Sequence, residues 1–177
     1  SCVLEARRGG QGDDGHRRAV DDLRHLTAEE LADVDRAVGP NGDTWLAGTF
    51  SGQLDLDPGA GELLRSNVNG ETFFLRLDAG GNLLQGVTSG TAVLPTLNEL
   101  MTDAAGNAYV AGWFEGTIDF DFGPGDATRL AVQTNAFVLK LTSSASFDFV
   151  STFGGNRWEE VNGLALDANG RLLVTGI

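Results

Sequence analysis

The chain has 177 residues, of which 41% are hydrophobic and 21% are charged, a composition typical of a folded domain with its own core. Its formal net charge of −13 disfavours nucleic acid and anionic membrane surfaces as partners, because both are polyanions. No apolar run in the sequence reaches the roughly 18 residues that a membrane-spanning helix needs, and a single cysteine excludes an intrachain disulfide.

Residues 1–35 form a degenerate N-terminal segment, in which the stretch 7–21 resembles 153–167 and is interpreted as the end of an earlier, lost repeat unit. Because the chain lacks an initiator Met and ends inside a predicted strand at 171–177, we expect a fragment of a longer protein. Cys2 has two interpretations: the lipid-bearing first residue of a processed bacterial lipoprotein, or an accident of trimming.

A short helix is predicted around residues 27–35, inserted before the first complete unit. Thr27 and Glu30 stand at the spacing of a capping box, ahead of Leu31 and Val34. The apolar stripe of this helix is thin, so the predicted helix is marginal.

An internal repeat with a period of 64 residues follows. Residues 42–105 align with 106–169 without a gap and share about 20 identities, and a third copy opens at Gly170. The identities fall at turn and core positions, such as Gly48 with Gly112 and Phe50 with Phe114. We expect a first repeat over 36–105, a second over 106–169 and the start of a third over 170–177.

Each repeat is predicted to consist of antiparallel strands without helices. The segment "TIDFDF" at 117–122 alternates polar and apolar residues, as a half-buried strand does, and "AYVAGWF", "AFVLKLT" and "FDFVSTF" are further strands joined by short polar turns. Four to five such strands per unit predict an all-β fold of tandem, four-stranded, propeller-like blades, too few here to close a ring. A β-solenoid fits less well because its repeats are shorter, and a two-sheet sandwich needs no such strict repetition.

The string "GN-x-YV-x-G-x-F-x-GT-x-DFD-x-G-x-G", followed by "NAFVLKL", "TFGG" and "ALDANG", resembles the bacterial β-propeller (SBBP-type) repeats of secreted and surface proteins over about residues 36–177. The period is longer than the roughly 40–50 residues of named propeller repeats. We expect the extra length in the excursion "DFDFGPGDATRLAVQT" at 119–134. The resemblance implies a non-enzymatic binding or interaction scaffold, extracellular or at the cell surface.

No catalytic constellation is recognisable in the sequence: His16 and His25 have no nucleophile beside them, and no phosphate-binding loop, dinucleotide fingerprint or zinc spacing occurs. One motif, "D-x-D-x-[PF]-G-x-G-[DE]", occurs twice. Its carboxylates are hard oxygen ligands of the kind that Ca²⁺ prefers, and the alternative is that they face solvent and support the turn. These candidate calcium ligands are Asp55, Asp57, Glu62, Asp119, Asp121 and Asp126. Asp103 and Asp167, each before a tight turn, are predicted to accept hydrogen bonds from the turn backbone.

Aromatic residues on the strands could line a sugar- or peptide-binding surface or fill the space between units. Trp45 and Tyr109 occupy equivalent positions and are predicted to be core residues; Trp113 and Phe114 are the other strand aromatics considered. Trp158 lies in a predicted loop, and loops carry variable function on a rigid scaffold. We therefore predict a surface for an unknown protein or carbohydrate partner at Asn156, Arg157, Trp158 and Glu159.

Three functional hypotheses remain open at this point. The favoured one is the non-enzymatic binding scaffold of an exported bacterial protein. The alternatives are a non-catalytic part of a secreted enzyme's propeller domain and a calcium-stabilised structural repeat array. In each case we also expect self-association through exposed strand edges, because an incomplete ring leaves them unpaired.

Overall fold

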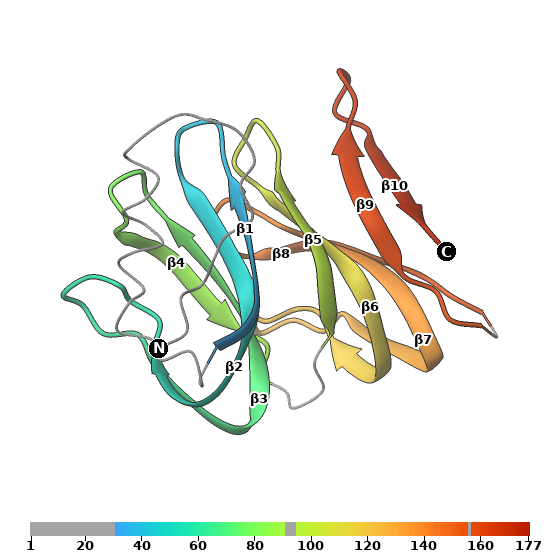
Figure 1. Ribbon diagram of the computed structural model, residues 1–177, viewed down its shortest axis with the longest axis horizontal. Coiled ribbons are helices and arrows are strands. Elements are labelled where there is room, and N and C mark those ends of the chain that lie inside the picture. The colour runs from blue at the N-terminus through green and yellow to red at the C-terminus, as the bar shows by residue number, and fades with distance from the viewer. Residues whose placement is uncertain (1–30, 91–94, 156) are drawn as a thin grey trace, which may run out of the picture.

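The computed structural model describes residues 31–90, 95–155 and 157–177, and within these ranges it contains ten strands and no helix. The strands form two four-stranded antiparallel sheets and a two-stranded hairpin (Figure 1). The first sheet consists of β1 (Leu31–Val38), β2 (Thr44–Asp55), β3 (Leu64–Leu77) and β4 (Leu83–Thr88). The second consists of β5 (Thr96–Thr102), β6 (Ala108–Asp119), β7 (Thr128–Leu141) and β8 (Phe147–Phe153), and the hairpin of β9 (Val161–Leu166) and β10 (Leu172–Gly176). The all-β prediction with antiparallel, four-stranded units is therefore confirmed.

The predicted helix around 27–35 is wrong over residues 31–35. These residues open β1, which pairs antiparallel with β2 in a register that places Leu31 opposite Phe50 and Ala37 opposite Trp45. Pairing with a neighbouring strand outweighs the local capping signal, because helix propensity is a weak preference that tertiary contacts override. Residues 27–30, with the rest of the predicted capping box, lie outside the described residues, as does the predicted remnant of an earlier unit at 7–21.

The 64-residue period of the sequence is also the period of the structure. β2 begins at residue 44 and β6 at 108, β3 at 64 and β7 at 128, and β4 at 83 and β8 at 147. The first strands of the sheets come earlier than the repeat boundaries expected from sequence identity: β1 spans residue 36, and β5 precedes residue 106. Each four-stranded sheet thus begins about ten residues before the stretches 42–105 and 106–169, over which the two copies of the repeat were aligned.

The two sheets stack face to face, and the hairpin β9–β10 continues the stack beyond the second sheet (Figure 1). Trp45, Ala47 and Phe74 of the first sheet share one core cluster with residues of the second, including Val110, Phe114, Phe137 and Leu139. A smaller cluster of Ala111, Val138 and Val161 joins the second sheet to the hairpin. Every second side chain of a central strand therefore serves one interface, and its neighbours serve the next.

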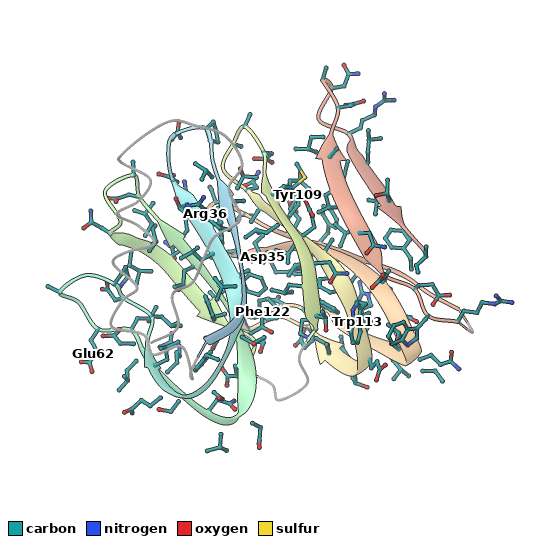
Figure 2. The ribbon with its side chains drawn as sticks, in the orientation of Figure 1. Asp35, Arg36, Glu62, Tyr109, Trp113 and Phe122 are labelled. Atoms are coloured by element: carbon teal, nitrogen blue, oxygen red, sulfur yellow. The ribbon has the colours of Figure 1, made fainter. Side chains whose placement is uncertain are left out.

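The excursion between β6 and β7 extends beyond the four-stranded part of the second sheet and folds back over its core. Ile118 and Phe120 are fully buried, and the ring of Phe120 lies 5.0 Å from that of Phe137. Phe122 crosses to the first sheet, where it stacks on Phe74 at 5.2 Å with an interplanar angle of 17° (Figure 2). The excursion predicted from the 64-residue repeat thus links the second sheet to the first through the stacking of Phe122 on Phe74.

Candidate functional site

The duplicated acidic motifs build turns. The Oδ1 atom of Asp55 accepts hydrogen bonds from the backbone N–H groups of Asp57 and Leu63, at 3.0 and 2.8 Å. Asp119 repeats the arrangement, accepting from the N–H groups of Asp121 and Ala127 at 3.0 and 2.9 Å. The first carboxylate of each motif therefore ties the two ends of its loop together.

The second carboxylate of each motif explains the glycines that follow it. Asp121 Oδ1 accepts a hydrogen bond of 2.8 Å from the N–H of Gly123, as Asp57 does from Gly59. A Cβ atom at Gly125 would lie 2.0 Å from Asp121 Oδ2, so a side chain cannot be placed there without moving the carboxylate. The repeated Gly-x-Gly of the motif leaves room for the carboxylate that lies against it.

The third acid of each motif does not join the other two. Glu62 is exposed at the tip of its loop (Figure 2), and Asp126 Oδ1 accepts a hydrogen bond of 2.9 Å from the N–H of Thr128. Hydrogen bonds from the Thr128 side chain and backbone lower the pKa of Asp126. Within the described residues no three His, Cys, Asp or Glu side chains are grouped to hold a metal ion. The geometry favours the turn-supporting role of these acids, and calcium binding stays a prediction.

Asp103 and Asp167 occupy the turns before β6 and β10 and accept hydrogen bonds as predicted. Asp103 Oδ1 accepts from the N–H groups of Ala105 and Asn107 at 2.9 and 3.0 Å, and Asp167 from Asn169 and Arg171 at 2.8 and 2.9 Å. Burial raises the pKa of Asp103, but the hydrogen bonds from Asn107 and Ala105 and the charge of Lys140 together outweigh it, and the net pKa is lowered. The backbone and side-chain hydrogen bonds of Arg171 lower the pKa of Asp167.

The aromatic residues divide into core and surface. Trp45, Tyr109 and Phe114 are buried, which confirms the core assignment of the first two. Trp158 is 63% exposed, and its ring leans on that of Trp113, with 5.7 Å between centroids and an angle of 33°. We call Trp113 and Trp158, together with Glu115, Phe153, Arg157 and Glu159, the tryptophan rim. It lies at the end of the second sheet, where Figure 2 marks Trp113.

The loop residues predicted as a partner surface frame this rim. Arg157 is exposed, and the N–H of Glu159 donates a hydrogen bond of 3.3 Å to Thr134 O, which anchors the loop to β7. Asn156 lies outside the described residues. The rim gains Phe153, 47% exposed, and Glu115, which accepts a hydrogen bond from Thr134 Oγ1 at 2.8 Å.

The sequence predicts Trp113 as an aromatic residue of a strand, but nothing in the local pattern places it beside Trp158. One signal was available: the first repeat carries Thr49 where the second has Trp113, and Leu94 where it has Trp158. Both tryptophans are departures from the repeat, and a side chain that the repeat does not need for packing is free to serve a binding surface.

Apart from the tryptophan rim, a shallow, polar depression lies where β1, β5 and β9 run side by side. It is lined by Val34, Asp35, Leu97, Asn98, Glu160 and Asn162. Asn98 donates a hydrogen bond of 2.9 Å from Nδ2 to the carbonyl oxygen of Val161, linking β5 to β9. The depression is therefore a seam between successive first strands, lined by two carboxylates and two amides.

A β-bulge recurs in each of these first strands and explains the glycine that lies opposite it in the second sheet and in the hairpin. The pairing shifts between Ala32 and Asp35 in β1 and between Leu97 and Glu99 in β5, and β9 shows the same irregularity opposite Gly176. A Cβ atom at Gly112 would lie 1.9 Å from the carbonyl oxygen of Thr96, and at Gly176 2.1 Å from that of Glu160. Glycine at these positions allows the bulged strand to approach, and the bulge turns Asn98 toward the seam.

Fold and site define a protein of tandem, stacked antiparallel sheets with an aromatic surface at one rim. No model of a known protein family matches the sequence, and no curated protein matches it either. In the part of the chain that the structure describes, no helix has the length and apolar character needed to cross a membrane.

Proposed function

We propose that the chain is a non-enzymatic β-propeller repeat scaffold of an exported bacterial protein and that it binds a partner at the cell surface. The proposal is supported by two stacked four-stranded sheets of equal register and by the hairpin that continues the stack. The first strands β1, β5 and β9 lie next to one another, as the inner strands of successive blades do around an axis. The exported location rests on the sequence resemblance.

The observation that carries the binding role is the exposure of Trp158 on a rigid support. Singly exposed apolar side chains are common, but contiguous apolar patches on a surface mark interaction sites, and here the Trp158 ring is joined to that of Trp113. Trp158 rests on Trp113, which is fixed in β6, and the loop that carries it is tied to β7. The rim is therefore preorganised, and little conformational entropy is lost when a partner binds.

The chemistry of the rim suits a carbohydrate or protein partner. A tryptophan face packs against the apolar face of a sugar ring or an apolar side chain, and the exposed carboxylate of Glu115 accepts hydrogen bonds from hydroxyl or amide groups. The charge of −13 disfavours an anionic partner.

Titration with soluble bacterial surface polysaccharides and with purified surface proteins, followed by isothermal titration calorimetry, tests this function. The expected result is a saturable heat of binding that the Trp158→Ala variant loses. The matched control is Val68→Ala, which also removes an exposed apolar side chain, 90% exposed, but on the first sheet. Binding that survives Trp158→Ala, or turnover of any added substrate that depends on a described residue, would contradict the proposal.

A further inference from the structure

Two carboxylates of the tryptophan rim have no cationic partner among the described residues. The ion pairs of that part of the chain lie elsewhere and join Arg76 to Asp43, Lys140 to Asp148 and Arg171 to Asp167. Glu115 is exposed, and the exposed Arg157 forms no ion pair with it or with Glu159. The Oε2 atom of Glu159 is shielded from water and accepts no hydrogen bond from a described residue. A carboxylate that has lost part of its hydration without gaining a donor is stabilised by an added cation.

A single buried residue, Thr134 of β7, holds both acids in place. Its side-chain Oγ1 donates a hydrogen bond of 2.8 Å to Glu115 Oε1, and its carbonyl oxygen accepts one of 3.3 Å from the N–H of Glu159. Thr134 is 1% exposed, so these two bonds are shielded from water. Glu115 follows Trp113 by two residues in β6, and Glu159 follows Trp158 directly. The acids and the tryptophan pair therefore share one rigid support.

These residues are particular to the second copy of the repeat. The five positions of the second copy and their equivalents in the first are Trp113 and Thr49, Glu115 and Ser51, Thr134 and Gly70, Trp158 and Leu94, and Glu159 and Pro95. The first copy has neither a charge nor an aromatic ring at any of them, yet it forms the same four-stranded sheet. The packing of the repeat does not require the five residues, so their joint presence indicates a surface of the second unit alone.

A flat cation matches both parts of this surface. The planar guanidinium of arginine stacks on an indole face and forms paired hydrogen bonds with a carboxylate, whereas the ammonium of lysine pairs as a point charge. Trp158 is 63% exposed and offers such a face, and Phe153, 47% exposed, adds an apolar neighbour for the chain that carries the arginine. The net charge of −13 attracts a basic partner. A neutral sugar would cover the tryptophans but leave both acids without a cation.

We propose that the tryptophan rim binds an arginine side chain of a basic polypeptide partner. The guanidinium stacks on Trp158 and pairs with Glu115, and Glu159 adds its negative charge beside them. Arg157 is the like charge at this surface and limits the affinity. The inference rests on the proposed binding function and names the class of partner.

The test uses the full chain, uniformly isotope-labelled for nuclear magnetic resonance, and the peptide acetyl-Gly-Phe-Arg-Ser-Gly-amide. Addition of the peptide should shift the indole N–H signal of Trp158 in a saturable way and leave that of the buried Trp45 in place. Replacing the arginine with citrulline, which keeps the shape but removes the charge, should weaken binding by about threefold or more. Replacing it with lysine should weaken binding by about twofold. Added salt should weaken the arginine peptide more than the citrulline peptide.

Variants of the chain separate the rim from the overall charge. Glu115→Gln, which keeps an acceptor oxygen for Thr134, and Glu159→Gln should each weaken the arginine peptide by about threefold, and Arg157→Gln should strengthen its binding by about twofold. The matched control is Glu62→Gln, which changes the net charge equally at an exposed acid beside the first sheet and should leave the affinity within about 1.5-fold.

Three outcomes overturn the proposal: no shift of the Trp158 signal at millimolar arginine peptide, equal binding of the citrulline peptide, or equal losses in Glu62→Gln and Glu115→Gln. The proposed binding function can survive such a failure. A polysaccharide whose heat of binding is abolished by Trp158→Ala, together with no binding of the arginine peptide, would keep the rim as a binding surface and reject the basic partner. No binding of either ligand would reject both.

Discussion

Trp45 and Gly106 are joined across the two sheets: the indole N–H of Trp45 in β2 donates a buried hydrogen bond of 3.1 Å to the carbonyl oxygen of Gly106, in the turn before β6. The equivalent of Gly106 in the third copy is Gly170, and Tyr109, the equivalent of Trp45, lines a depression with it. The first two units are thus joined at this position by a hydrogen bond, whereas the equivalent side chain of the second sheet lines a depression beside the hairpin.

Replacing Trp45 with Phe should destabilise the chain. The change leaves the buried carbonyl of Gly106 without its donor, which costs about 1–3 kcal/mol, and adds the loss of packing. Urea unfolding measures the difference. The same substitution at the exposed Trp158 is the control and should change the unfolding free energy by less than about 0.5 kcal/mol; similar losses at both sites would contradict this role of the hydrogen bond.

Gly112→Ala should be more damaging than Gly116→Ala. A Cβ at Gly112 would lie 1.9 Å from Thr96 O, whereas at Gly116 it meets nothing within 4 Å and only the φ of +72° opposes it. We expect a loss of more than about 3 kcal/mol for Gly112→Ala, from the displaced bulge, and about 1 kcal/mol for Gly116→Ala, from the left-handed backbone. Thermal and urea unfolding compare the two, and equal losses would contradict the close approach of β5.

Asp119→Ala and Asp119→Asn separate the turn from a calcium site. The alanine variant loses both hydrogen bonds to the loop and should cost about 2–3 kcal/mol, whereas asparagine keeps an acceptor oxygen and should cost less than about 1 kcal/mol. The turn geometry also predicts equal melting temperatures in millimolar Ca²⁺ and in EDTA. A rise of several degrees with Ca²⁺, abolished by Asp119→Asn, would instead establish the calcium-stabilised array.

Asp78, in the turn between β3 and β4, accepts hydrogen bonds from the N–H groups of Gly80 and Asn82 at 2.8 and 2.9 Å, as Asp103 and Asp167 do in their turns. Acid should destabilise the chain through these three turns. The pKa of each is lowered from 3.8, chiefly by hydrogen bonds from Asn82 at Asp78 and from Arg171 at Asp167. A lowered folded-state pKa means that the stabilisation is fully present above pH 3.8 and is lost as the pH falls through the lower folded value. The triple Asp→Asn variant should show a shallower loss of unfolding free energy below pH 4, measured by urea titration; an unchanged slope would contradict this assignment.

The repeat made the strands predictable, but not the partners of each strand. Identities such as Gly48 with Gly112 located β2 and β6, because the same packing demands the same residue twice. They did not locate β1, whose residues 31–35 carry a local helix signal and become a strand through pairing with Phe50 and Ala47 of β2. Local sequence does not contain that pairing.

The candidate site was predictable in part, for a similar reason. The exposure of Trp158 followed from its place in a predicted loop. Its contact with Trp113 depends on how the loop after β8 returns across the end of β6, and residues so far apart in sequence are brought together by the stack. The turn-supporting alternative for the acids of the duplicated motifs followed from the glycines beside them. The separate hydrogen bonds of each acid depend on the folded loop and could not be predicted.

Three side chains of the first sheet contact residues that come later in the sequence, in the second unit. Trp45 donates to Gly106 O, Phe74 stacks on Phe122, and Arg76 donates to Ser143 O. During synthesis on the ribosome, the first sheet therefore emerges with the Trp45 indole, the Phe74 ring and the second amino group of Arg76 exposed to water until the second sheet has left the exit tunnel. The packing of the first sheet is completed by the second, which is synthesised after it. A pause in translation between residues 90 and 145 would therefore leave an aggregation-prone intermediate that needs a chaperone.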